Sequence, residues 1–154
     1  MDGSATNGRK IFNGCYRHGV DDKRRVQVPA KWRPENGEAE FVLIIWRKYH
    51  FAPHLRVLPM QMMHDLLAKI NSLPDFEESK GALKRVIGSS SENVTLDKGG
   101  RICLPEEMAQ AVGITKEAVL VGCMDYFEIW APEYYEKVKV LDENLMPKMF
   151  SLIP

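Results

Sequence analysis

The chain has 154 residues, of which 45% are hydrophobic and 27% are charged, and its formal net charge is zero. This composition is close to the globular average and excludes disordered, collagen-like and low-complexity proteins. The longest apolar run, residues 41–46, is too short to cross a bilayer, and we expect no secretory signal because no basic segment leads into a long apolar stretch at the start. We therefore expect a cytoplasmic protein without a membrane partner, built as one ordinary domain or as two small ones fused.

The N-terminal part of the chain is basic. Residues 1–35 hold eight basic and four acidic side chains, so the compensating negative charge lies in the rest of the chain. Such a chain can present one basic face to phosphate, although an ordinary solvated surface explains the charge equally well. Residues 1–11, which include Arg9 and Lys10, are expected to form a disordered extension.

A repeat organises the chain. The segment Val20–Pro29 recurs as Leu96–Pro105 at an offset of 76 residues, and both read apolar-Asp-x-x-x-Arg-apolar-x-apolar-Pro. Residues 55–59 are matched by residues 127–132, with an offset of 73 between their prolines. The signals follow the same order in both halves, which indicates a tandem duplication.

Each half predicts the same series of elements. A strand leads into a tight turn that contains Asp, and a short strand with alternating apolar positions follows. A helix, a buried strand, another short strand and a second helix come next. Each helix is expected to begin with proline at its first position, where the missing N–H costs nothing. These prolines are Pro29, Pro59, Pro105 and Pro132.

Residues 15–61 are assigned to the first repeat, 62–90 to linking helices and 91–134 to the second repeat. The helix from Pro59 carries an apolar stripe that predicts core packing, formed by Met60, Met63, Leu66, Leu67 and Ile70. A second linking helix is predicted to turn four residues inward: Phe76, Leu83, Val86 and Ile87. Each repeat is too small to bury a sufficient core alone, so the halves are expected to interleave.

Residues 135–154 are expected to form a C-terminal helix and tail. Its apolar residues are dense enough to predict docking on another surface, and they are Leu145, Met146, Met149, Phe150, Leu152 and Ile153. The three cysteines, Cys15, Cys103 and Cys123, are odd in number, lack CxxC spacing and have apolar neighbours. We interpret them as reduced core residues, not as a disulfide framework or a zinc site.

The two Asp-x-x-x-Arg pairs have two interpretations. Asp21 and Arg25 stand at the ends of the first turn, as Asp97 and Arg101 do in the second. A carboxylate in this position can accept turn amides and pair with the guanidinium, which makes the pair a structural staple of the hairpin. Such an ion pair contributes little to stability if it is exposed.

The other interpretation is contact with nucleic acid. More cations surround the first turn than one carboxylate can neutralise, namely Arg17, Lys23, Arg24 and Arg25. Cations on a rigid hairpin suit phosphate, and a planar guanidinium can bind guanine bidentately. The second turn carries Lys98 and Arg101 but also two glycines, so the first turn is expected to supply most of the affinity for DNA.

The paired motifs resemble the MraZ family. The resemblance runs from Phe12 to about Tyr135, and it rests on the two Asp-x-x-x-Arg segments, on Phe12-x-Gly14, on residues 120–122 and on residues 127–130. It implies an α+β, mainly β fold in which two SpoVT-AbrB-type swapped-hairpin β-barrel halves form an intrachain pseudo-dimer with flanking helices.

The resemblance also implies a function. It implies a nucleoid-associated repressor that assembles into a homo-oligomeric ring and binds G-rich direct repeats in double-stranded DNA. The implied target is the division and cell-wall gene cluster, including the protein's own gene. In the family the hairpins face DNA, which assigns Arg25 and Arg101 here. The family has Gly where Arg24 stands, so this turn is expected to be stiffer and more basic.

Two alternatives belong to other functional classes. An enzyme is disfavoured because the histidines are scattered without metal spacing and no nucleophile or phosphate-loop motif is present. Asp97, Asp125 and Glu128 could supply catalytic carboxylates, but Glu128 is expected to face solvent or a subunit. The second alternative is a protein-binding ring or an antitoxin-like module of the same fold. No cofactor, metal or small-molecule substrate is expected.

Overall fold

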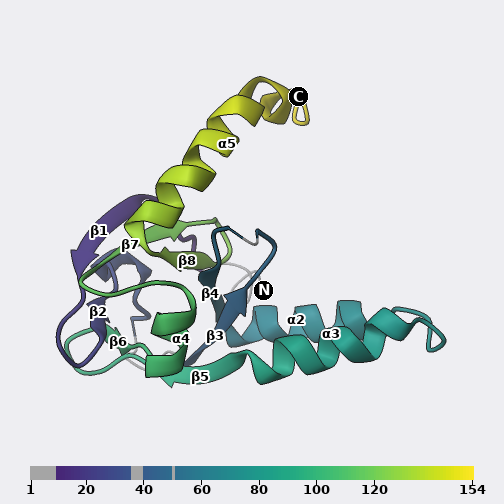
Figure 1. Ribbon diagram of the computed structural model, residues 1–154, viewed down its shortest axis with the longest axis horizontal. Helices are drawn as coiled ribbons and strands as arrows, with labels where there is room; N and C mark the ends of the chain where they lie inside the picture. The colour runs from purple at the N-terminus through teal and green to yellow at the C-terminus, as the bar shows by residue number, and fades with distance from the viewer. Residues whose placement is uncertain (1–9, 36–39, 50) are drawn as a thin grey trace, which may run out of the picture.

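The computed structural model describes residues 10–35, 40–49 and 51–154, so the expected extension over residues 1–11 lies outside it except for Lys10 and Ile11. The described residues form a six-stranded antiparallel sheet and a two-stranded ribbon with helices around them (Figure 1). This confirms the predicted α+β, mainly β class. The strands are β1 (Cys15–Gly19), β2 (Arg25–Gln27), β3 (Glu40–Trp46), β4 (His54–Pro59), β5 (Ser91–Thr95), β6 (Arg101–Cys103), β7 (Glu117–Gly122) and β8 (Phe127–Trp130). The helices are the 3-10 helix η1 (Ala30–Trp32), α2 (Met60–Asn71), α3 (Glu78–Ser89), α4 (Glu106–Ala111) and α5 (Pro132–Phe150).

Strands from the two halves intermingle in the sheet, whose order is β1-β7-β8-β4-β3-β5. β1 of the first half pairs with β7 of the second, and β5 of the second half pairs with β3 of the first. β4 and β8 meet in the middle of the sheet, one from each half. Each half therefore supplies an outer strand to the other, which confirms that the halves interleave.

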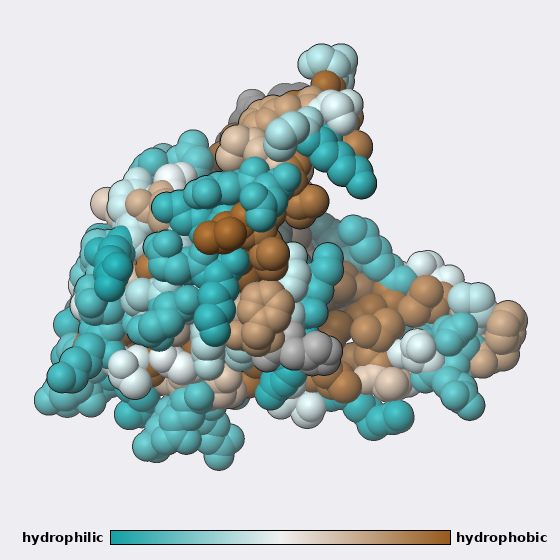
Figure 2. Space-filling view, turned by 45° about the horizontal axis from the view of Figure 1, so that its top comes forward, coloured by the Kyte–Doolittle hydropathy of each residue, from teal (hydrophilic) through white to brown (hydrophobic). Residues whose placement is uncertain are grey.

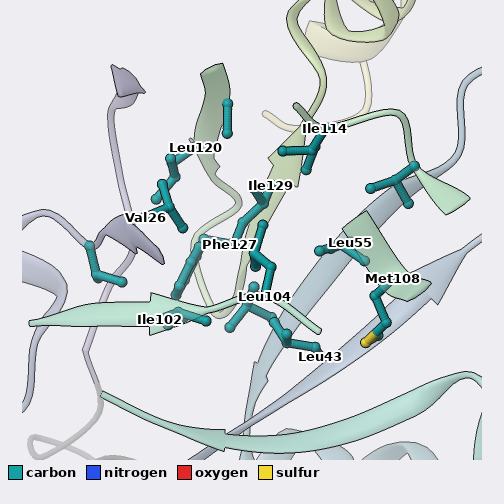
Figure 3. Close-up of a cluster of buried hydrophobic side chains, with 14 of the residues drawn as sticks. Val26, Leu43, Leu55, Ile102, Leu104, Met108, Ile114, Leu120, Phe127 and Ile129 are labelled. Carbon is teal, nitrogen blue, oxygen red and sulfur yellow. The ribbon is translucent and has the colours of Figure 1, made fainter. Parts of the chain in front are cut away.

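The ribbon of β2 and β6 packs its inner face on the core. Val26 and Ile102 lie opposite each other and are fully buried, as are Val28 and Leu104, which follow them in the chain. Figure 3 shows Val26, Ile102 and Leu104 converging with Phe127 and other apolar residues of the sheet. Burial of each such side chain contributes about 1.5–3 kcal/mol. This packing fixes the ribbon's orientation, so its other face must point outward.

The prolines precede the helices, but three of them stand one position earlier than predicted. Pro59 and Pro105 are the N-cap residues of α2 and α4, and Pro29 stands before η1. All three have extended backbone, with ψ between 139° and 150°. An N-cap residue adopts such a conformation and its N–H makes no helical hydrogen bond, so proline fits there at no cost. Pro132 alone of the four lies inside its helix, at the start of α5.

α2 packs on the sheet and α3 does so only in part. The methionines of α2 and Leu66 contact a cluster on the outer face of the sheet, whereas Leu67 is exposed. On the second linking segment only Ile87 joins this cluster, and the inward prediction is wrong for three exposed residues: Phe76, Leu83 and Val86. The reason is geometric, because α2 and α3 project together from the sheet and no other described element covers their far side (Figure 1).

α5 also leaves the body of the molecule. Val138, near its start, is buried in a cluster with Trp130. The predicted docking of the tail is not found within the described chain, since six residues are exposed: Leu145, Met146, Met149, Phe150, Leu152 and Ile153. Figure 2 shows hydrophobic surface over α5 and along the α2–α3 pair. Among the described helices, none combines the length and the apolar character needed to span a membrane.

The cysteines are free, but the interpretation of all three as core residues is wrong. Cys15 and Cys103 are exposed, and Cys123 is partly buried. Cys103 lies between the buried residues Ile102 and Leu104, so the alternation of a strand turns its side chain outward. Cys15 lies at an exposed position of the edge strand β1. Apolar neighbours in the sequence therefore do not indicate burial in a strand that has one solvent-facing side.

Candidate nucleic-acid interface

The outer face of the β2–β6 ribbon carries residues from both halves of the chain. Arg25 pairs with Cys103 and Gln27 pairs with Arg101 across the ribbon. Because residues alternate along a strand, these four side chains share the face opposite to the buried Val26 and Ile102. Arg25 and Arg101 are separated by 76 positions in the sequence, and the structure brings both to this single exposed face. We call it the ribbon face.

The first turn is held together by the carboxylate of Asp21. Its Oδ1 accepts hydrogen bonds from the amides of Lys23 at 3.0 Å and Arg25 at 2.8 Å, and its Oδ2 accepts one from Arg25 Nε at 2.7 Å. These donors stabilise the ionised carboxylate, with the Arg25 amide contributing most, and hold the pKa of Asp21 below its ordinary value. Asp21 therefore orients Arg25 from its Nε side.

The second turn repeats this geometry. Asp97 Oδ1 accepts from the amides of Gly99 and Arg101, both at 2.9 Å, and Oδ2 accepts from Arg101 Nε at 2.9 Å. The pKa of Asp97 is also lowered, chiefly by the Arg101 amide. About a third of each arginine side chain is exposed, 32% for Arg25 and 36% for Arg101. The staple interpretation thus describes the geometry of both Asp residues, and in each it is the Nε of the arginine that bonds to the carboxylate.

The other predicted cations lie at different places. Lys23 and Lys98 are exposed in the turns. Arg24 has left-handed backbone, with φ of 61°, and its Nε donates to the carbonyl of Leu104 at 3.0 Å. Arg17 lies apart, on β1, where its guanidinium binds the Glu117 carboxylate through two hydrogen bonds of 3.0 and 3.2 Å. The structure therefore groups the turn residues but separates Arg17 from them and compensates its charge.

Two residues of the ribbon face, Gln27 and Cys103, were not predicted from the sequence to lie there. Gln27 Nε2 donates to the carbonyl of Gly99 at 2.7 Å, and Cys103 Sγ donates to the carbonyl of Lys23 at 3.4 Å. Gln27 and Cys103 are equivalent under the 76-residue offset, and each bonds to the turn of the other half. The alternating pattern Arg-apolar-x in both motifs was the signal that could have placed them beside the arginines.

A second polar cluster lies inside the sheet and not on the ribbon face. Buried His54 contacts Glu128 through Nε2 at 3.1 Å and stacks on Trp130 at 3.9 Å. Trp130 Nε1 donates to the other oxygen of Glu128 at 2.9 Å. Burial is the largest single influence on the pKa of Glu128 and acts to raise it, but the contacts with His54, Trp130 and Arg56 together outweigh burial and the pKa is lowered. Glu128 is expected from the sequence to face solvent or a subunit, and the solvent alternative is wrong because His54, Arg56 and Trp130 surround its carboxylate and leave only 13% of the side chain exposed.

This cluster does not resemble a metal or catalytic centre. Within the described residues, no three His, Cys, Asp or Glu side chains converge to hold a metal. Asp97 belongs to the second turn, so it does not pair with Glu128. Burial raises the pKa of the nearby Cys123 and Tyr126 to about 12 each. Both groups are therefore protonated at neutral pH and serve as packing residues.

Comparisons with known proteins give one family. The family described as "MraZ protein, putative antitoxin-like" matches residues 89–146. A protein named transcriptional regulator MraZ from Herpetosiphon aurantiacus is 37% identical over 83% of this chain and 86% of its own length. Proteins of the same name from Ruegeria sp. and Leuconostoc citreum are each 32% identical, over 92% and 82% of this chain and over 90% and 85% of their own lengths.

Proposed function

The chain belongs to the MraZ family, and on that premise we propose that it is a DNA-binding transcriptional regulator that contacts double-stranded DNA with its ribbon face. The names of its relatives describe regulators of transcription and no enzymatic activity. The single observation that carries the proposal is the position of Arg25 and Arg101. They come from different halves, point outward from one ribbon and are oriented by matching carboxylates.

A two-stranded ribbon fits the major groove of DNA, where a guanidinium can bind guanine O6 and N7 together. We assign this role to Arg25 and Arg101, because their staples fix Nε and leave the terminal N–H pair available. Lys23, Lys98 and Arg24 would bind phosphates beside the groove. Arg17 is a flanking phosphate contact that becomes available only when its ion pair with Glu117 opens.

The assembly is part of the proposal. We infer two SpoVT-AbrB-type halves, residues 15–61 and 91–134, linked by 62–90 and followed by 135–154. The exposed apolar surfaces of α5 and of the α2–α3 pair are different surfaces on one chain. A contact between such surfaces on neighbouring copies is heterologous, and heterologous contacts form a ring when the rotation between copies closes. We further infer that this assembly is a nucleoid-associated ring that represses the division and cell-wall gene cluster, including its own gene, through direct repeats.

One observation favours a second candidate. The same exposed apolar surfaces could bind a different protein, as in an antitoxin-like module or a protein-binding ring without an operator. Salt separates the two functions, because DNA binding through cations weakens steeply with salt and an apolar protein contact does not.

The test is titration of a labelled duplex from upstream of the chain's own gene at several salt concentrations. We expect tight binding at low salt that falls steeply as salt rises. Arg25→Ala should weaken it about 10- to 100-fold, the range for one bidentate base contact. Lys69→Ala, an exposed lysine on α2, is the matched control and should change nothing. Binding that does not depend on salt or on Arg25 would contradict the proposal.

A further inference from the structure

Two arginines at unmatched positions of the repeat make matching contacts. Arg24 Nε donates to the carbonyl of Leu104 at 3.0 Å, and Arg33 Nε donates to the carbonyl of Val28 at 2.9 Å. Val28 and Leu104 are equivalent under the 76-residue offset, and each precedes a proline. The arginines are not equivalent, because the offset aligns Arg24 with Gly100 and aligns Arg33 with Ala109, which lies in α4.

The missing side chain at Gly100 explains why Arg33 takes at the second turn the place that Arg24 has at the first. Gly100 has left-handed backbone, with φ of 78°, similar to that of Arg24. A Cβ added to Gly100 would collide with the guanidinium and Cδ of Arg33. Arg33 therefore occupies the space that a side chain at position 100 would need, and it reaches this place from the segment after η1 in the first half of the chain. The second turn therefore has a guanidinium at this place, as the first turn does, although the residue equivalent to Arg24 is Gly100.

We propose that Arg33 is a DNA-contacting residue, which binds backbone phosphate at the second turn as Arg24 does at the first. The inference rests on the proposed function and extends it. Counting Arg33, the second turn holds three cations against Asp97 alone. The first turn holds three against Asp21 and Asp22. The charge balance then no longer favours the first turn.

The length of the ribbon supports phosphate as the partner. Arg25 and Val28 stand at its two ends, about 10 Å apart at ~3.4 Å per extended residue. The major groove is about 12 Å wide. A ribbon laid across it would place the Arg24 guanidinium beside one phosphate strand and the Arg33 guanidinium beside the other. Both arginines are half-buried and lie beside the ribbon face, whose alternating positions belong to Arg25, Gln27, Arg101 and Cys103.

The experiment measures binding of two labelled duplexes, one from upstream of the chain's own gene and one of unrelated sequence, across a salt series. Arg33→Gln removes the charge but keeps an amide donor for the Val28 carbonyl. We expect Arg33→Gln to weaken binding to both duplexes several-fold and to a similar degree. The slope of log affinity against log salt should become shallower by about 0.9 for each lost contact. The melting temperature should change little.

A double variant tests whether an arginine at position 100 can replace Arg33. Arg33→Ala with Gly100→Arg rebuilds at the second turn the arrangement of the first, where Arg24 is part of the turn and the residue equivalent to Arg33 is Ala109. We expect it to restore the slope, whereas Gly100→Arg alone should lower the melting temperature because it collides with Arg33.

Each outcome has a distinct meaning. An unchanged slope in Arg33→Gln, while Arg25→Ala still loses binding, overturns this inference and leaves the proposed function intact. Loss of affinity with a lower melting temperature and an unchanged slope makes Arg33 structural and also overturns it. Failure of a folded double variant to restore the slope overturns the equivalence of positions 33 and 100. Wild-type binding that is insensitive to salt and to Arg25 overturns both proposals.

Discussion

The turn at residues 21–25 and the turn at residues 97–101 share one staple and differ at the residue before the arginine. In both, the Asp carboxylate accepts hydrogen bonds from the backbone amides of the third and fifth residues of the turn, counted from the Asp. In both, the fourth residue has left-handed backbone, but it is Arg24 in one turn and Gly100 in the other. Glycine adopts this conformation freely, whereas another residue incurs a cost of about 1–2 kcal/mol. The comparison teaches that the Asp sets the turn and that the fourth position can change while the geometry stays.

The largest expected effect tests whether the two turns are equal partners. Arg25→Ala and Arg101→Ala should each weaken operator binding about 10- to 100-fold, because each loses one bidentate base contact. Fluorescence anisotropy of a labelled operator duplex measures this, with circular dichroism to establish folding. A large loss at Arg25 beside no loss at Arg101 would break the equivalence of the turns.

A change in the DNA tests whether copies present their turns in parallel. Head-to-tail neighbours should bind direct repeats spaced by about one helical turn, roughly 10 base pairs. Inserting half a turn between two repeats should reduce the affinity towards that of a single repeat, because avidity is lost. A gel shift with both duplexes measures this. Preference for an inverted repeat would contradict the head-to-tail arrangement.

The staples themselves should have a smaller effect. Asp21→Asn and Asp97→Asn keep the size of the side chain but weaken its bonds to the amides and to the arginine. We expect a lower melting temperature in both variants and a few-fold weaker binding, since the arginine is less well oriented. A gain in affinity without loss of stability would mean that the carboxylates merely repel phosphate.

Much of this comparison could be predicted from the sequence. The 76-residue repeat identified both Asp-Arg pairs and the order of the elements, because equivalent positions carry equivalent residues. It could not identify Arg33, since interleaving brings Arg33 to Gly100 and these positions are not equivalent. Periodicity likewise marked Phe76 and Val86 as apolar but could not reveal that nothing in the described chain covers them. Long-range packing, which a local pattern does not contain, decided both cases.

Acid should remove the contribution of the two staples together. The folded-state pKa values of Asp21 and Asp97 lie below the ordinary value of about 3.9, so their stabilisation is present above that pH. It is lost as the pH falls through the lower folded-state values. Thermal melts from about pH 6 to about pH 3 should show a steeper loss in the wild type than in the double variant Asp21→Asn/Asp97→Asn. Parallel curves would exclude this linkage.

The smallest expected effect concerns the fourth position. Arg24→Gly relieves the left-handed strain but removes the hydrogen bond to Leu104, which contributes about 0.5–1.5 kcal/mol. The two changes nearly offset, so the melting temperature should stay close to that of the wild type. Binding should weaken several-fold on any DNA sequence. A large loss of stability would show that the first turn depends on Arg24 in a way that the second turn does not depend on a side chain at position 100.

The pairing of strands from the first half with strands from the second half has a consequence for synthesis of the chain. Residues 15–19 pair with residues 117–121, and residues 40–44 pair with residues 91–95. A ribosome adds about 5–20 residues per second, so β1 leaves it about 5–20 s before its partner strand exists. Until the second half emerges, β1, β2, β3 and β4 each lack the partner strand that the second half supplies, and unpaired strand edges pair readily with other chains. Neighbouring nascent chains on one messenger could therefore exchange halves before either is complete.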